Sequence, residues 1–538
     1  MKQRKKWLLM LVFSFVAAIV LAACGGNTET EGDPSDDGAG TDDTDNTEEV
    51  VGEAAEGGEL IFVTPSDAPT LDPHGVNDTA SNTATSQMLE RLTDYNEDGE
   101  VIPLLAESFE PINDLTWEFK LREGIKFHDG TDFNAEAVKV SLERILDEEF
   151  ASPKRVILAM ISEVEVIDDY TVQISTEEPF AALPAHLAHN AGSIIAPSAI
   201  EEENNGGKTV DENPIGTGPF ELDSWNRGAE ILMVKNENYW GEGPYLDSIK
   251  FISVPEQATR VAMLESGEAH IMLVGASDVN RVEAMSQIEI DRVSGTRMDY
   301  VGINLEKEPF DDKLVRQAVA MAINKDDVVD GILDGQGVPA VGPLAPTVVG
   351  NHQDLVPLPY DVEGAKELLA EAGYADGFST TIFVNDGSKE RADIAEFVQT
   401  QLAEIGITVD IEVIEWGAFL EKTAAGEHEL FVLGWTTVTG DADYGLYNLF
   451  HSSQFGDPGN RSFYSNSRVD ELLDLGRTST DQDERNQAYK EVSEILVDEV
   501  PMIYLHHPDF VHGMNGVSSG LFVNFSGTPF FKDVQLAQ

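Results

Sequence analysis

Cysteine is almost absent from this 538-residue chain, since Cys24 is the only one. A chain without a second cysteine forms no internal disulfide and no cysteine-based metal site. Basic residues are also scarce: 34 Lys and Arg stand against 98 Asp and Glu, which gives a formal net charge of −64 and a pI near 4.2. Such a surface repels phosphate backbones, so nucleic acid is excluded as a partner class.

Recognisable catalytic motifs are missing as well. The sequence contains neither a Gly-x-Ser-x-Gly nucleophile elbow nor a His-Glu-x-x-His metal helix. Residues 206–209 resemble the end of a phosphate-binding P-loop, but Glu202 stands where the first glycine of that pattern belongs. Residues 94–99 copy the first half of a calcium loop, yet Leu105 replaces the bidentate glutamate, so a surface turn is favoured. We therefore predict no catalytic activity, no cofactor and no metal.

Two histidine pairs carry a weaker metal signal. His186 and His189 are three residues apart and could share one helix face, whereas the adjacent His506 and His507 would point in different directions from a strand. Neither pair has further ligand-type residues close by in the sequence. Isolated histidines are therefore favoured over a metal site.

The N-terminus has the pattern of an export signal. Basic residues at positions 2, 4, 5 and 6 precede an apolar run over residues 7–20, which is short for a membrane span. Residues 21–25 (LAACG) resemble the bacterial lipobox, in which the cysteine is lipidated and becomes the first residue of the mature protein. This pattern predicts a lipoprotein signal peptide at residues 1–23 and an acyl anchor on Cys24. The alternative is an ordinary cleaved signal followed by an unrelated cysteine.

Residues 24–58 are predicted to form an acidic, disordered tether. Residues 25–58 contain twelve acidic residues and no Lys or Arg, and like charges extend such a linker. Removal of the four basic residues of the signal changes the net charge from −64 to −68. We interpret this acidity as suited to a saline habitat, where salt screens the repulsion. The hydrophobic content of 41% predicts that the rest of the chain folds.

After residue 58, strand and helix patterns alternate. Residues 60–64 form a short β-rich run, and residues 116–121 alternate like a half-buried strand followed by a turn at residues 128–130. Asn134 stands at a cap position before a helical apolar stripe that ends at Leu146.

The clearest alternation lies between Asp361 and Trp435. Asp361 is placed to cap a helix that Gly373 ends. Strand, helix, strand, helix and strand patterns follow at residues 380–384, 394–405, 407–414, 416–425 and 430–433. This predicts an α/β fold with a parallel sheet covered by helices. Because ligands bind beyond the carboxyl ends of such strands, the loop expected at residues 434–437 is the first candidate site.

Residues 216–220 (GTGPF) form a second candidate loop. Its glycines either present backbone amides to a ligand or simply turn the chain.

Several segments together resemble the family 5 extracellular solute-binding proteins, the receptor subunits of bacterial peptide- and nickel-type ABC importers. These segments are residues 105–108 (LAES), 117–130 (WEFKLREGIKFHDG), 213–220 (NPIGTGPF), 238–241 (NYWG) and 309–318 (PFDDKLVRQA). Residues 434–443 (GWTTVTGDAD) and 459–464 (GNRSFY) are most similar to glutathione- or peptide-binding members. The resemblance extends from Glu59 to the C-terminus.

The resemblance implies an α/β, two-lobed, periplasmic-binding-protein-like fold with an interlobe cleft. Lobe one would take residues 59–305, with a smaller subdomain at about 105–210, and would be completed by residues 505–538. Lobe two would take residues 306–504. The two chain crossings near Asn304 and Leu505 would act as a hinge, and a bound ligand would favour the closed form.

The implied function is solute capture without catalysis. A lipid-anchored monomer on the outer face of the cytoplasmic membrane would bind a di- or oligopeptide, or a glutathione-like solute, and deliver it to ABC permease subunits. Alternatives are a nickel chelate, an opine or an oligosaccharide on the same scaffold, an exported hydrolase, and a sensory role that feeds a membrane kinase.

The implied ligand site surrounds the loop at Trp435. Its candidate residues are Trp435, Thr436, Thr437, Val438, Asp441, Asp443, Tyr444, Arg461 and Asn304. Dipeptide and oligopeptide members hold the ligand's amine with an aspartate three residues after the tryptophan, a position that Val438 occupies here. An aliphatic side chain cannot pair an ammonium, and loss of such a buried partner costs about 3–5 kcal/mol.

Several roles stay open at this stage. Either Asp441 or Asp443 supplies the missing carboxylate from a shifted position, as a γ-glutamyl peptide would require, or both are turn and cap residues. Arg461 is the nearest cation for a ligand carboxylate, although a structural ion pair is favoured. Trp435 and Tyr444 stack on the ligand or belong to the core.

Overall fold

The computed structural model describes residues 54–537 except Asn77, Asp98 and Pro458. The signal peptide, Cys24 and tether residues 24–53 lie outside the described residues. Strand β1 (Ala54–Ala55) pairs with β24 (Gln535–Ala537), and the amide of Gly58 donates to Asp247 Oδ2 at 2.9 Å. Residues 54–58 were predicted as tether, but this strand pairing and the hydrogen bond to the Asp247 side chain make them part of the folded body.

A seven-stranded sheet has the order β13-β20-β12-β2-β11-β10-β9. Strand β2 lies near its centre, parallel to β11 and β12, which confirms the strand predicted after residue 58. Leu60 and Phe62 pack into one buried cluster and Val63 into another, as expected for a strand covered on both faces. The strands are β2 (Glu59–Thr64), β9 (Phe220–Asn226), β10 (Glu230–Lys235), β11 (Ser248–Ser253), β12 (Ile271–Leu273), β13 (Glu289–Ser294) and β20 (Asp509–Met514); helices α6 (Gln257–Ser266) and α7 (Ala276–Glu283) flank β12.

A four-stranded antiparallel sheet, in the order β5-β6-β8-β7, packs against helices around its own core. Its strands are β5 (Ala106–Asn113), β6 (Thr116–Leu121), β7 (Ile161–Asp168) and β8 (Thr171–Thr176), and its helices are α2 (Ala135–Leu146), α3 (Arg155–Leu158) and α4 (Leu183–Ala188). Asn134 caps α2 by accepting from the Ala137 amide, as predicted. Helix α1 (Thr79–Thr85) and the hairpin β3 (Thr93–Tyr95) and β4 (Val101–Pro103) precede this sheet, and α5 (Pro197–Asn204) follows it.

The glycines of the segment at residues 216–220 allow a close approach to the backbone. A Cβ on Gly216 would lie 2.1 Å from Met88 O, and the Gly218 amide donates to the same oxygen at 2.9 Å. Only a residue without a side chain fits there. The segment therefore turns the chain against residue 88, and its Gly218 amide is already engaged.

A six-stranded sheet has the order β15-β19-β14-β18-β16-β17. Strands β16, β17 and β18 are parallel, as predicted, but β14 runs antiparallel to both β18 and β19, so the sheet is mixed. Asp361 caps α10 (Val362–Glu371), and Gly373, at φ +93°, follows the end of this helix. The strands are β14 (Arg297–Ile303), β15 (Val338–Pro339), β16 (Ser379–Asn385), β17 (Thr408–Ile414), β18 (Leu430–Thr436) and β19 (Met502–His507).

Eight helices accompany the six-stranded sheet within the described residues. They are α8 (Lys313–Met321), α9 (Lys325–Ile332), α10 (Val362–Glu371), α11 (Lys389–Ala403), α12 (Trp416–Ala424), α13 (Ala442–Phe450), α14 (Ser467–Thr478) and α15 (Gln482–Glu499). Within the described range no helix is both long and apolar enough to span a bilayer.

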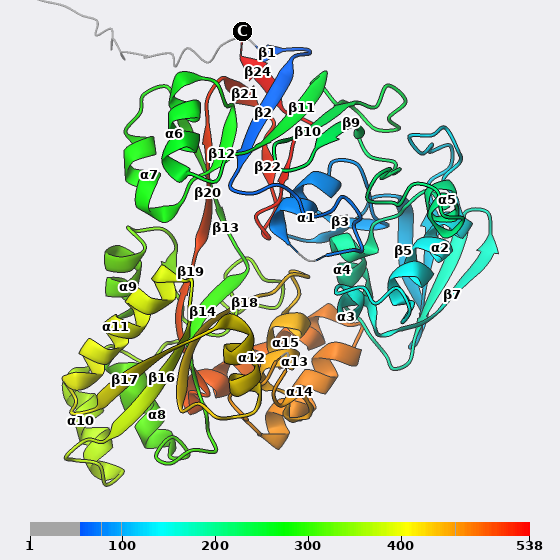
Figure 1. The fold of residues 1–538 in the computed structure, drawn as a ribbon. Coiled ribbons are helices and arrows are strands. Elements are labelled where there is room, and N and C mark those ends of the chain that lie inside the picture. Colours follow the sequence, from blue (N-terminus) through cyan, green and yellow to red (C-terminus); the bar gives the residue numbers. More distant parts are fainter. Residues whose placement is uncertain (1–53, 77, 98, 458, 538) are drawn as a thin grey trace, which may run out of the picture. The chain divides into compact units, whose positions relative to one another are not determined.

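Two short links connect the seven-stranded and six-stranded sheets. Strand β13 leads into β14 through residues 295–296, and β19 leads into β20 through Pro508 (Figure 1). The chain crossings were expected near Asn304 and Leu505, but neither residue lies in a link. Asn304 follows the C-terminal end of β14, and Leu505 lies inside β19. Because β14 pairs with β18 and β19, the six-stranded sheet already begins at residue 297.

Candidate functional site

The segment after β18 is positioned by pairing with β14. Gly434, Trp435 and Thr436 were expected in a loop, but they continue the strand opposite Asp299, Met298 and Arg297. The strand is longer than its apolar run because its partner comes from a distant part of the sequence. The loop itself comprises residues 437–440, and the Thr437 amide donates to Thr296 O at 3.3 Å, next to a link between the sheets.

Trp435 and Tyr444 stack on each other at the mouth of this loop. Their ring centroids are 5.5 Å apart with an interplanar angle of 26°. The buried Nε1–H of Trp435 has no acceptor among the described residues, and burial raises the pKa of the Tyr444 hydroxyl to about 12. Both rings also contact the core, so packing accounts for much of their placement.

Asp441 and Asp443 are buried and already paired. Asp441 caps α13 by accepting from the Asp443 amide and forms contacts of 2.7 and 2.9 Å with Arg485 Nη2. Asp443 makes a bidentate pair with Arg477, with both contacts at 2.9 Å. This geometry favours the cap and ion-pair reading over that of a free carboxylate for a ligand amine.

Arg461 and Asn304 lie away from the loop, although both were predicted as ligand residues. Arg461 donates to Leu420 O and Thr423 Oγ1, and pairs with Asp457 at 2.5 Å. Asn304 donates to Gly426 O and His428 O. Asn304 follows Ile303, which pairs with Leu430 at the start of β18, whereas Trp435 lies near the other end of that strand. Both side chains therefore hold loops together at the opposite edge of the sheet.

Two cavities border the loop. The larger, about 420 Å³, has walls from β3 to β6, α4, the loop and α15, and includes Tyr95, Trp117, Thr439, Asp441 and Arg485. Tyr95 Oη lies 2.6 Å from both Ala185 O in α4 and Thr439 O in the loop. Tyr95 therefore connects the loop to α4. A volume of this size falls within the range of small-molecule sites.

The smaller cavity, about 40 Å³, contains Val438 in its wall. We call it the Val438 cavity; its other lining residues include Asn82, Arg91, His189, Asn190 and Phe525. None of these five residues was predicted as a ligand residue, and His189 was considered only as part of a histidine pair. The one available signal was the pair of charges, Glu90 and Arg91, inside the apolar run of residues 88–92, and both side chains are buried.

The two histidine pairs have different surroundings. His186 Nδ1 lies 2.6 Å from Ile157 O, and His189 Nδ1 accepts from the Ala191 amide at 3.0 Å. His506 does meet distant carboxylates: one atom each of His506, Asp299 and Glu390 lie within 4.8 Å of one another. The guanidinium of Arg297 lies 2.6 Å from Asp299 and 3.9 Å from Glu390, and supplies the cation of this cluster.

Comparisons with known proteins identify the family. The profile "Bacterial extracellular solute-binding proteins, family 5 Middle" matches residues 100–457. The chain belongs to this family. The resemblance found in the sequence motifs is thereby confirmed.

Relatives of this family 5 protein include binding proteins for glutathione and peptides. It is 36% identical over 457 residues to the glutathione-binding protein GsiB of Escherichia coli (strain K12), covering 83% of this chain and 88% of that one. Among solved structures it is similar to DppA from Helicobacter pylori in complex with the peptide STSA (TM-score 0.73, 33% identity, 90% and 99% coverage). It is also similar to HbpA2 from Haemophilus parasuis (TM-score 0.83, 29% identity, 89% and 100% coverage). The two-lobed periplasmic-binding-protein fold expected for this family 5 protein is confirmed by these neighbours.

Proposed function

We propose that this family 5 protein is the lipid-anchored receptor of an ABC importer and binds a peptide-type solute, either a di- or oligopeptide or a glutathione-like molecule. The observation that carries the proposal is the cavity of about 420 Å³ at the carboxyl end of β18, with Tyr95 and Trp117 on one side and residues 439–441 on the other. Its aromatic and polar lining suits a short peptide. Capture and release leave the solute chemically unchanged.

The proposed lobes follow the sheets. With the expected boundaries moved to the links between the sheets, lobe one consists of residues 59–294 with a subdomain at about 105–210, completed by residues 509–538, and lobe two of residues 297–507. The seven-stranded and six-stranded sheets support this division, and the links at residues 295–296 and 508 suggest where the chain bends on closure.

Thermal unfolding with a solute panel tests the cargo. A peptide-type solute at 100 times its Kd adds about 2.7 kcal/mol to the free energy of unfolding. With an unfolding entropy of about 2 cal/mol/K per residue, this raises Tm by roughly 2–3 °C. The panel contains glutathione, di- and tripeptides, a nickel chelate and an opine. A shift produced by the chelate or the opine alone contradicts the peptide assignment.

The anchor is tested separately on the full chain in a bacterial host. The wild-type chain is expected in the membrane fraction and should resist a high-salt wash. Each acyl methylene buried in the bilayer contributes about 0.8 kcal/mol to the free energy of membrane binding, and this contribution does not depend on charge. Cys24→Ala is expected to move it to the soluble fraction or leave it unprocessed. A Cys24→Ala chain that is processed and stays on membranes contradicts the lipid anchor.

A further inference from the structure

Three residues that line the Val438 cavity carry hydrogen-bond donors without an acceptor among the described residues. Arg91 is 3% exposed and its Nε is buried without a partner among the described residues. His189 Nδ1 accepts from the Ala191 amide at 3.0 Å, and burial lowers the pKa of His189 to about 3. The neutral ring therefore carries its proton on Nε2, which makes that atom a donor.

Asn82 is a third donor, because its amide orientation is fixed. Asn82 Oδ1 accepts from Lys154 Nζ at 2.8 Å and from Asn190 Nδ2 at 2.7 Å. No hydrogen bond engages Asn82 Nδ2 within the part of the chain that the structure describes. The amide nitrogen is thus the atom that Asn82 has left to offer the cavity.

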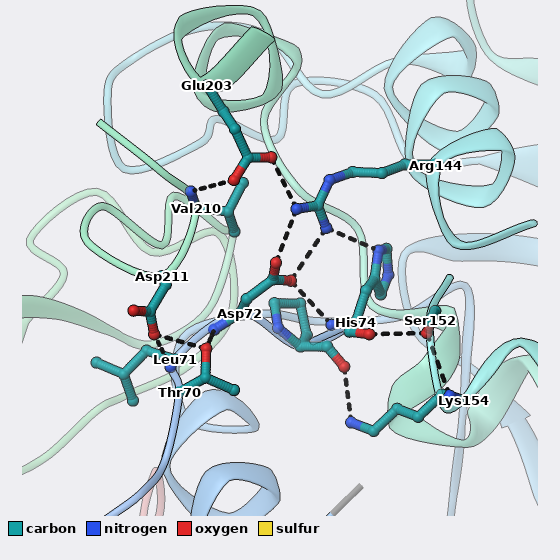
Figure 2. A network of polar contacts seen from close by, with 11 residues as sticks. Thr70, Leu71, Asp72, His74, Arg144, Ser152, Lys154, Glu203, Val210 and Asp211 are labelled. Atoms are coloured by element: carbon teal, nitrogen blue, oxygen red, sulfur yellow. Dashed lines mark hydrogen bonds and ion pairs between the residues drawn. The ribbon is translucent and has the colours of Figure 1, made fainter. Parts of the chain in front are cut away.

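Lys154 fixes the orientation of the Asn82 and Asn190 side-chain amides. Its side chain is 1% exposed, and Nζ donates to Pro73 O at 2.6 Å as well as to Asn82 Oδ1 and Asn190 Oδ1 at 2.8 and 2.9 Å. Turning either amide over would leave a buried ammonium with an unmade bond, which is costly. Figure 2 shows Lys154 beside Ser152, at the edge of the polar network around Asp72 and Arg144.

The carboxylates of Asp72, Asp78 and Asp94 do not line the cavity. Asp72 forms a bidentate pair with Arg144, at 2.7 and 3.0 Å (Figure 2). Asp78 caps α1 through Oδ1, while its Oδ2 is buried without a partner among the described residues, and Asp94 Oδ2 pairs with Arg91 Nη2 at 2.8 Å. Val438 itself is aliphatic. The described residues that line the cavity thus include the donors Arg91, Asn82 and His189 but no Asp or Glu.

We propose that the Val438 cavity is a carboxylate subsite, in which Arg91, Asn82 and His189 donate to the anionic end of the bound solute while Lys154 acts as the positioning residue. This proposal rests on the proposed function and deepens it, since it assigns the solute an exposed carboxylate at this point. A subsite of this kind binds an anionic group of the solute, whereas the aspartate of the dipeptide-binding members binds a cationic amine. Binding requires the cavity to open, because 40 Å³ is too small for a peptide terminus.

Isothermal titration of the full chain in detergent tests the subsite with matched probes. The probes are Ala-Ala-Ala and its C-terminal amide, and glutathione and its diethyl ester. Masking the carboxylates is expected to weaken binding about ten- to a hundredfold, the range for a lost hydrogen bond to a charged group. Arg91→Met is expected to lower the affinity for the free-carboxylate probes by the same factor and the affinity for the amide much less. Arg260→Met is the control, because Arg260 is also buried with an unpartnered Nε but lies on α6.

The role of Lys154 has its own readout in the pH profile. Burial lowers the pKa of Lys154 to about 7, so affinity for the free-carboxylate probes is expected to fall severalfold from pH 6 to 8.5 as the ammonium loses its proton. His74 and His189, with pKa values lowered to about 3, stay neutral over this range. The other charged neighbours are Asp72, Asp78, Arg91 and Arg144. Lys154→Met is expected to weaken binding and flatten the profile. Lys325→Met, a control at a half-buried lysine whose pKa burial also lowers, to about 8, is expected to leave both unchanged.

The outcomes separate the two proposals. Equal affinity for free and masked probes, or an Arg91→Met chain that binds the free probes like wild type, overturns the subsite and leaves the peptide function standing. If no probe binds wild type, the peptide function fails instead. Mass spectrometry of the solute released on denaturation then decides the subsite, which a solute without a carboxylate contradicts.

Discussion

The free energy of unfolding of the wild-type chain is expected to fall as the pH is lowered from 6.5 to 4.5. In a His428→Leu variant this fall is expected to be smaller by about 2 kcal/mol. His428 is fully buried, its ring lies 4.7 Å from that of Phe431, and burial lowers its pKa from 6.5 to about 3. The unfolded chain therefore binds a proton at this site that the folded chain refuses. Stability from this site is complete above pH 6.5 and is lost as the pH falls toward 3. One pKa unit corresponds to about 1.4 kcal/mol, which sets the magnitude.

The difference between two proteins isolates this site from the rest of a very acidic chain. Urea unfolding of wild type and His428→Leu at pH 7.5, 6.5, 5.5 and 4.5 gives the two profiles, and surface carboxylates contribute equally to both. His352→Leu, at a half-buried histidine, serves as the control and is expected to follow wild type. Parallel profiles for wild type and His428→Leu would show that His428 gains a proton in the folded chain.

Local sequence patterns determined much of the fold because the relevant physics is local. Asp361 as cap and Gly373 as terminator placed α10, and the apolar stripes placed the helices and parallel strands that follow it. The motif-based family resemblance then implied the two-lobed architecture. Residues that lie close together in the chain could be assigned to one site, as Trp435, Val438 and Tyr444 were.

What could not be predicted depends on pairs far apart in the sequence. Strand β18 extends to Thr436 because Arg297 pairs opposite it, more than a hundred residues earlier. The walls of the Val438 cavity come from Asn82 and His189, whose neighbours give no sign of a shared site. Asn304 and Arg461 were grouped with Trp435 by resemblance, but strand direction places them at the opposite edge of the sheet.

Replacing Asp441 with alanine is expected to lower the free energy of unfolding by about 3–5 kcal/mol, the range for breaking one partner of a buried ion pair. Asp441 and Arg485 are 5% exposed each. Their contacts of 2.7 and 2.9 Å compensate a guanidinium that alanine would leave buried and unpaired. The change also removes the cap of α13, worth about 1 kcal/mol. Urea unfolding at constant pH measures the loss.

A second variant tests whether the unpaired charge, rather than the lost cap, causes this destabilisation. Asp441→Ala combined with Arg485→Met removes both charges, so the double variant is expected to recover most of the lost stability, because an apolar pair of similar volume costs little desolvation. Glu491→Ala breaks the exposed pair with Arg468 and is expected to cost at most about 1 kcal/mol. If Asp441→Ala costs no more than Glu491→Ala, Arg485 reaches water once its partner is gone. If the double variant is no more stable than Asp441→Ala, the cap and packing outweigh the charge.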